Sequence, residues 1–81
     1  MTVRVLPFAR IREIVGAATL ERSVPDGATA ADLWAQLARD FPALGELTGS
    51  TRVVRNGALV ETSVTLADDD EVALLPPFGG G

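Results

Sequence analysis

The chain has 81 residues, of which 47% are hydrophobic and 22% are charged, as expected for one folded domain with a single modest core and not for a disordered chain. Its formal net charge of −4 argues against a nucleic-acid-binding protein and favours a partner with a basic groove. The absence of Cys, His, Tyr and Lys removes the usual nucleophiles and general bases, which predicts a domain that is not an enzyme by itself.

The first expected element is a strand over residues 2–9, "TVRVLPFA". Alternation places Val3 and Val5 on one face, and Arg4, Leu6 and Phe8 on the other. Pro7 cannot donate a hydrogen bond to a neighbouring strand, so this end of the strand is expected at an edge, a bulge or the exit of the sheet.

A short helix and a second strand are expected next. Residues 9–16, "ARIREIVG", offer one or two helical turns that end at Gly16 as a C-cap. Residues 18–24, "ATLERSV", have the pattern of a strand, and "PDG" at 25–27 that of a turn.

The main helix is predicted over residues 29–41, "TAADLWAQLARDF", with Pro42 ending it. Thr29 is a good N-cap and Asp32, three residues later, completes the pattern of a capping box. Six apolar residues recur at helical spacing: Ala30, Leu33, Trp34, Leu37, Ala38 and Phe41. Such a stripe can form a ligand or partner groove, but a domain this small needs it for its core, and we expect it there.

The second half of the chain predicts a loop at 43–50, a hairpin at 51–61 with Asn56-Gly57 as its turn, and a last strand ending at Leu75. Asp68 to Glu71 form an acidic run before this strand. No second acidic cluster at ligand spacing joins the run, so we expect a solvated turn and no metal site.

These elements predict an α+β architecture: a mixed sheet of about five strands packed against one main helix, with the first and last strands as parallel central neighbours. This is the ubiquitin-like β-grasp pattern. The expected domain covers residues 1–75, and residues 76–81 form an extended C-terminal tail, "PPFGGG".

The tail is the strongest functional signal. Pro76 and Pro77 prevent it from continuing the sheet, and Gly79, Gly80 and Gly81 have no Cβ to obstruct passage through a narrow channel. Fully extended, the six residues from Pro76 span roughly 20 Å, enough to reach an active site on another protein. The alternative is that the tail is a flexible chain end without function.

A partner surface is predicted on the face of the sheet without the main helix. In the last strand Val72 and Leu74 share one face and Ala73 and Leu75 the other. Leu6, Phe8 and Leu75 are therefore expected together on the helix-free face, with Leu59 and Phe78 as additions. The alternative is that neighbouring loops cover Leu6 and Phe8.

Four stretches together resemble the small subunit of molybdopterin synthase, and they cover nearly the whole chain: "RVLPFARIREIVG", "TAADLWAQL", "VVRNGALV" and "LADDDEVALLPPFGGG". The most specific is "DEVALLPP" followed by the final Gly80-Gly81 pair. Sulfur carriers for thiamine, cysteine or tRNA thiolation resemble it too, although the double proline is more similar to the molybdopterin branch. The chain departs from the pattern at Asp69, where Gly is frequent, and at Gly79, where Ser, Thr or Ala is more usual.

The resemblance implies a sulfur carrier. A ubiquitin-activating-type adenylyltransferase would use ATP and magnesium to adenylate the Gly81 carboxylate, and a sulfur donor enzyme would convert it to a thiocarboxylate. The large subunit of molybdopterin synthase would then place the sulfur on a pterin precursor of the molybdenum or tungsten cofactor. No cofactor bound to the chain itself is expected. A ubiquitin-like interaction module whose tail does no chemistry is the alternative from another class.

The expected location is the cytoplasm. The N-terminus, "MTVRVLPFAR", lacks the order of charged, hydrophobic and small residues of a signal peptide. No apolar run approaches the roughly 20 residues of a membrane span, so no membrane partner is predicted.

Overall fold

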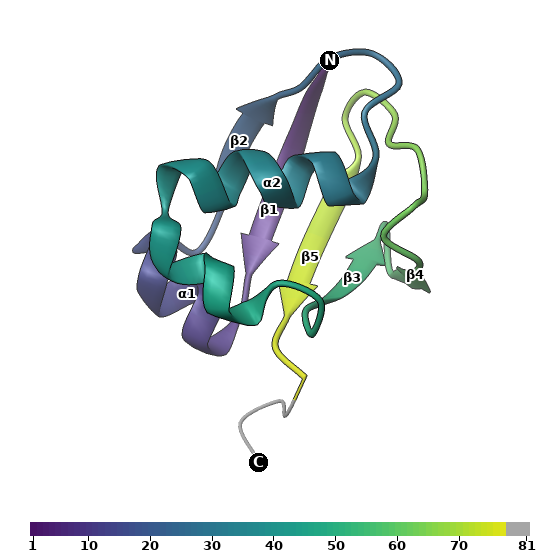
Figure 1. Ribbon diagram of the computed structural model, residues 1–81. Coiled ribbons are helices and arrows are strands. Elements are labelled where there is room, and N and C mark those ends of the chain that lie inside the picture. The colour runs from purple at the N-terminus through teal and green to yellow at the C-terminus, as the bar shows by residue number, and fades with distance from the viewer. Residues whose placement is uncertain (78–81) are drawn as a thin grey trace.

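Five strands form one mixed sheet in the computed structural model, which describes residues 1–77 (Figure 1). The strands are β1 (Thr2–Pro7), β2 (Leu20–Ser23), β3 (Arg52–Arg55), β4 (Ala58–Val60) and β5 (Glu71–Leu75). Their order is β2-β1-β5-β3-β4. β1 and β5 are parallel, and the other neighbouring pairs are antiparallel. The predicted central pair of first and last strands is confirmed.

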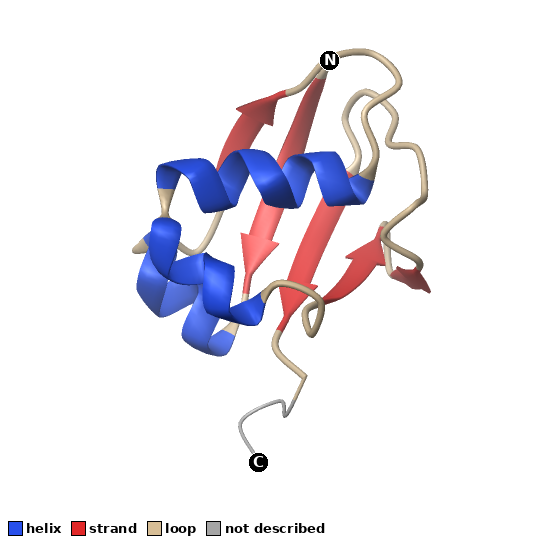
Figure 2. Cartoon of the chain, viewed as in Figure 1, coloured by secondary structure: helices blue, strands red, loops and turns tan. Residues whose placement is uncertain are grey.

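The sheet has one face covered by helices and one face without them (Figure 2). The helices are α1 (Ala9–Val15), α2 (Ala30–Asp40) and the 3₁₀ helix η1 (Pro42–Leu47). In β1 and β5 buried residues alternate with more exposed ones, because successive side chains point to opposite faces. We call the uncovered side the helix-free face.

The sequence of α2 accounts for its start and its buried side. The Thr29 side chain accepts a hydrogen bond from the Asp32 amide at 3.2 Å, and the Asp32 carboxylate accepts one from the Thr29 amide at 2.9 Å, which confirms the capping box. Three members of the apolar stripe are fully buried: Ala30, Leu33 and Leu37. The other three, Trp34, Ala38 and Phe41, are only partly buried against the core.

The core lies between the sheet and the helices. Its buried apolar members are Val3, Val5, Ile11, Val24, Ala28, Ala30, Leu33, Leu37, Leu44, Val53, Leu66, Val72 and Leu74. An ion pair between Arg22 and Asp40 joins the edge strand β2 to the end of α2. The core contains residues from nearly every element, so the strand ends are held rigidly with respect to one another.

Two expectations about element bounds were wrong. The segment at 43–50 was expected to be a loop, but η1 occupies its first part. Pro42 favours this start because the fixed φ of proline suits the first turn of a helix, and Leu44 holds the helix in place by its burial in the core. The first strand was expected to reach residue 9. It ends at Pro7, the exit of the sheet, where Pro7 pairs in register with Leu74.

The predicted turns are confirmed by backbone geometry. Asn56 and Gly57 both have positive φ, 50° and 86°, as the two central positions of a type I′ hairpin turn require. Gly16 ends α1 with a φ of 80° and donates its amide to the Arg12 carbonyl. Asp69, where the sequence departs from the pattern that it resembles, adopts a φ of 68°, which Asp tolerates better than most residues.

Candidate functional site

An apolar row crosses the helix-free face along four neighbouring strands. The register pairs Leu6 of β1 with Ala73 of β5, Ala73 with Val54 of β3, and Val54 with Leu59 of β4. Leu6, Ala73 and Val54 are partly buried, whereas Leu59 is 67% exposed. We call these four residues the apolar row.

Phe8 and Leu75 lie beside the apolar row, toward the end of the sheet where β5 stops. Phe8 is extended, with φ −123° and ψ 153°, and its amide continues the ladder by donating to the Leu74 carbonyl at 3.1 Å. Its side chain is 45% exposed, so loops do not cover it. Across β5, Leu75 pairs with Arg52, which adds one positive charge to this end of the face.

Most of the predicted interface residues therefore lie together. The structure brings Leu6, Phe8, Leu59 and Leu75 to one face, and their role in partner binding stays a prediction. Pro76 is buried and Pro77 exposed as the chain leaves β5. The predicted tail residues Phe78, Gly79, Gly80 and Gly81 lie outside the described residues.

Val54 belongs to the apolar row and was missed by sequence reasoning. The strand "RVVR" has two adjacent valines between two arginines, so alternation alone does not say which valine faces the helices. Val54 pairs with Ala73, which the alternation of the last strand places on the helix-free face, so Val54 lies on that face too.

The chain turns from β1 into α1 through a sharp elbow at Ala9. This residue has a φ of 51°, a left-handed conformation that costs a non-glycine residue of order 1–2 kcal/mol. Two contacts hold the elbow on either side: the Phe8 amide bonds to Leu74, and Ile11 is fully buried. The elbow therefore fixes Phe8 beside the apolar row.

The acidic run contains a buried carboxylate that corrects the expectation of a fully solvated turn. Asp70 accepts hydrogen bonds from the Ala67 amide at 2.8 Å and from the Asn56 side-chain amide at 2.9 Å. The guanidinium of Arg55 lies 3.6 Å away. Asp70 thus ties the hairpin turn to the turn that starts β5, while Asp68 and Asp69 remain exposed.

The environment of Asp70 lowers the pKa of its carboxyl group. Burial, the largest single influence, raises this pKa, but the Ala67 amide, the Asn56 side chain and the Arg55 charge together outweigh burial. Because the folded-state pKa lies below the unfolded value, ionised Asp70 stabilises the fold above that value. This stabilisation is lost as the pH falls through the folded-state pKa.

We expect Asp70→Asn to lower the free energy of unfolding at pH 7 by about 1–3 kcal/mol, because the substitution weakens hydrogen bonds to a buried charged group. Denaturant unfolding of wild type and variant from pH 7 down to pH 2 should show a difference that shrinks as the pH falls below the ordinary Asp pKa of about 3.9, where the unfolded state binds a proton, and through the lower folded-state pKa. Asp69→Asn is the matched control, since Asp69 is exposed and Asn tolerates its left-handed backbone. A pH-independent difference for Asp70→Asn would contradict this account.

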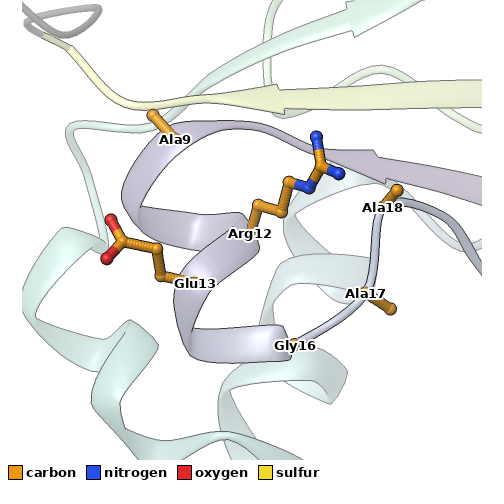
Figure 3. Close-up of a pocket in the computed structure, with 6 residues that line it drawn as sticks. All are labelled: Ala9, Arg12, Glu13, Gly16, Ala17 and Ala18. Carbon is orange, nitrogen blue, oxygen red and sulfur yellow. The ribbon is translucent and has the colours of Figure 1, made fainter.

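A shallow hollow of about 510 Å³ lies beside α1 (Figure 3). Of the described residues that line it, two are charged, Arg12 and Glu13, whose side chains point in different directions in Figure 3, and the rest are alanines and Gly16. Neither side chain has a partner within the hollow that would make it a nucleophile or base. We assign no chemistry to this hollow.

The described part of the chain presents an apolar surface and no cluster of metal-ligating side chains. Within residues 1–77, no three His, Cys, Asp or Glu side chains gather as a set of metal ligands. No helix in this range has the length and hydropathy needed to cross a bilayer. What the fold does present is a row of apolar side chains next to the strand from which the C-terminal residues continue.

Comparison with known proteins gives consistent results over the full chain. The model of the ThiS family matches residues 5–81. The molybdopterin synthase sulfur carrier subunit of Chlamydomonas reinhardtii is 36% identical over 83 residues, covering 100% of both chains. The crystal structure of small archaeal modifier protein 1 from Haloferax volcanii superimposes with a TM-score of 0.83 at 32% identity, again over 100% of both chains.

A third relative was solved together with another protein. In the complex of subunits 1 and 2 of molybdopterin-converting factor from Helicobacter pylori, the matching chain has a TM-score of 0.69 and 26% identity, with 100% of both chains covered. The β-grasp fold predicted from the sequence is confirmed by these structures. By its full-length family match and its identity to a sulfur carrier subunit, the chain belongs to the ThiS family of ubiquitin-like sulfur carriers.

Proposed function

We propose that this chain is the sulfur carrier subunit of a molybdopterin synthase, and that the sulfur is held as a thiocarboxylate on Gly81. The observation that carries the proposal is the apolar row, which lies next to the end of β5. A partner that covers this face would sit beside the point where Pro76 and Pro77 leave the sheet. The relative from Helicobacter pylori, which was solved with a second subunit, supports a large subunit as this partner.

The chemistry requires activation of the terminal carboxylate before sulfur can be attached. With an ordinary pKa near 3.5, the carboxylate is ionised at neutral pH and is a poor electrophile. In the activating enzyme, one carboxylate oxygen attacks the α-phosphorus of ATP and pyrophosphate leaves. A sulfur nucleophile at the hydrosulfide oxidation level then adds to the acyl carbon, and AMP leaves with the former carboxylate oxygen.

The chain itself contributes a docking surface and reach to this scheme. The apolar row, Phe8 and Leu75 provide apolar surface for the large subunit. The six residues from Pro76 to Gly81 span roughly 20 Å when extended, which is enough to deliver the sulfur into a neighbouring subunit. Ordering three glycines costs backbone entropy, and the partner's contacts must offset that cost.

The test is an intact-mass measurement after coexpression with the activating enzyme and sulfur donor. We expect a mass increase that corresponds to exchange of one oxygen for sulfur, and alkylation of that sulfur by a thiol reagent. The chain contains no cysteine, so fragmentation should place the alkyl group at Gly81. An unmodified carrier, beside a control carrier that is modified by the same enzymes, would refute the proposal.

The molybdopterin pathway is distinguished from related pathways by the partner. We expect the chain to bind a pterin-binding large subunit encoded in the same genome. Association with a thiazole synthase, a cysteine synthase or a tRNA-modifying enzyme instead would assign the same tail chemistry to another product.

A second candidate function is protein modification, favoured by 35% identity to small archaeal modifier protein 1 over 82 residues. In this case the activated Gly81 would form an amide bond with a lysine amine of another protein, and AMP would be released. Coexpression with the activating enzyme should then yield adducts heavier than the target by about 8.5 kDa that resist thiol reagents. If no such adducts form under conditions that produce the thiocarboxylate, protein modification is ruled out and only the sulfur-carrier function remains.

A further inference from the structure

A second concave surface lies on the helix-covered side of the molecule. A groove of about 650 Å³ runs along the outer side of α2, between that helix and the chain that leads from η1 to β3. Three alanines of α2, at 31, 35 and 38, line it beside Trp34. Their small side chains leave the groove open where larger residues would fill it.

Trp34 makes this groove suitable for an apolar side chain. Its indole Nε1 donates a hydrogen bond to Thr48 Oγ1 at 2.9 Å, so the one polar atom of the ring is satisfied within the protein. The ring is only partly buried against the core, and it lines the groove. A partly exposed indole with a satisfied N–H is the kind of rigid aromatic surface on which interface side chains anchor.

The charge of the groove is opposite to that of the chain. Among residues 1–77, Arg39 in the last turn of α2 is the only charged residue that lines the groove, although the chain as a whole has a net charge of −4. None of the ion pairs found within residues 1–77 includes Arg39. An occupant with a carboxylate close to an apolar side chain would complement this arrangement.

The groove is continuous with the helix-free face. A second hollow of about 610 Å³ shares Gly49, Thr51 and Thr62 with the groove and reaches Arg52 and Leu59. Leu59 is the exposed end of the apolar row. The two hollows therefore lead from the predicted partner surface, around the β3–β4 edge of the sheet, to Trp34.

We infer that this groove, the α2 groove, receives a segment of the same large subunit that covers the apolar row. The segment passes around the edge of the sheet, places an apolar side chain against Trp34 and sets a carboxylate beside Arg39. The inference rests on the proposed function, because it takes the large subunit to be the partner of the helix-free face. It adds a second binding region, on the opposite side of the sheet.

Ala35→Glu tests the inference without disturbing the core. Ala35 is exposed, and a glutamate there fills the groove and stands four residues before Arg39, where it can pair with the guanidinium on the helix surface. We expect the affinity for the large subunit to fall at least tenfold. Ala43→Glu is the matched control: it adds the same side chain at an exposed position of η1 that lines neither hollow, and we expect a change below twofold.

A single fluorine probe reports directly on the groove. Trp34 is the only tryptophan, so labelling the chain with 5-fluorotryptophan gives one ¹⁹F resonance in the folded protein. We expect this resonance to shift when the unlabelled large subunit is added. Arg39→Glu is a second variant, also at an exposed position, and it should weaken binding several-fold without loss of the fold.

The outcomes separate this inference from the function on which it rests. If wild type binds the large subunit, but Ala35→Glu and Arg39→Glu bind equally tightly and the Trp34 resonance does not move, the α2 groove is not occupied and the carrier function stands. If wild type does not bind the large subunit at all, the proposed function fails, and the inference fails with it. Weaker binding by both variants together with a shifted resonance supports the groove.

Discussion

Removal of Gly80 and Gly81 should abolish sulfur loading and leave the fold unchanged. The shortened chain still ends in a glycine carboxylate, on Gly79, so the chemical group is retained and only its reach decreases, by about 7 Å. A misplacement of even 1 Å can cost an enzyme a factor of about 100 in rate, so we expect loading below detection. Intact mass after alkylation measures it.

The control for this truncation is a chain of full length with Gly79→Ala. It keeps the terminal pair and adds one methyl group at a position where the family usually has a small residue. We expect loading of this variant, and unfolding transitions of both variants that match wild type, because both changes leave the buried core residues found within residues 1–77 intact. Sulfur on the new terminus of the truncated chain would show that reach does not determine loading.

Leu59→Asp should reduce the affinity for the large subunit by about 100-fold. Leu59 is 67% exposed at the end of the apolar row, so the substitution costs the free protein little, whereas an interface that covers it must desolvate an unpaired carboxylate. Titration calorimetry or surface plasmon resonance with the purified large subunit measures the change.

Ala58→Asp is the matched control for Leu59→Asp. It introduces the same charge on the same strand, at an exposed neighbouring residue whose side chain points to the opposite face. Equal losses for the two variants would point to a general charge effect. Unchanged affinity for a folded Leu59→Asp variant would remove Leu59 from the interface.

The architecture was predictable because its determinants are local. The alternation around Val3 and Val5, the capping residues of α2 and the Asn56-Gly57 turn each define one element without reference to the rest of the chain. The parallel pairing of β1 and β5 followed from the order of these elements. The face on which Leu6, Phe8 and Leu75 lie followed from the two-residue period of a strand.

The features that were missed depend on contacts between distant residues. Asp70 is buried because Asn56, fourteen residues earlier, and Arg55 meet it, and four consecutive acidic residues give no sign of which one turns inward. The apolar stripe of α2 was expected to be core, but Trp34 is only partly buried against the core and lines the α2 groove.

The place of β5 between β1 and β3 also determines when this protein can fold. Val5 pairs with Val72, 67 residues later in the chain (72 − 5), so the central ladder has a high contact order and its formation requires closure of a long loop. During synthesis β1 can pair only with β2, the short antiparallel strand that follows it, until β5 has been made. A product interrupted before Glu71 lacks β5 and leaves the inner edges of β1 and β3 without partners, which makes it prone to aggregation or proteolysis. The cell therefore obtains a folded domain only from a chain that already includes β5, the strand that leads to the C-terminal residues.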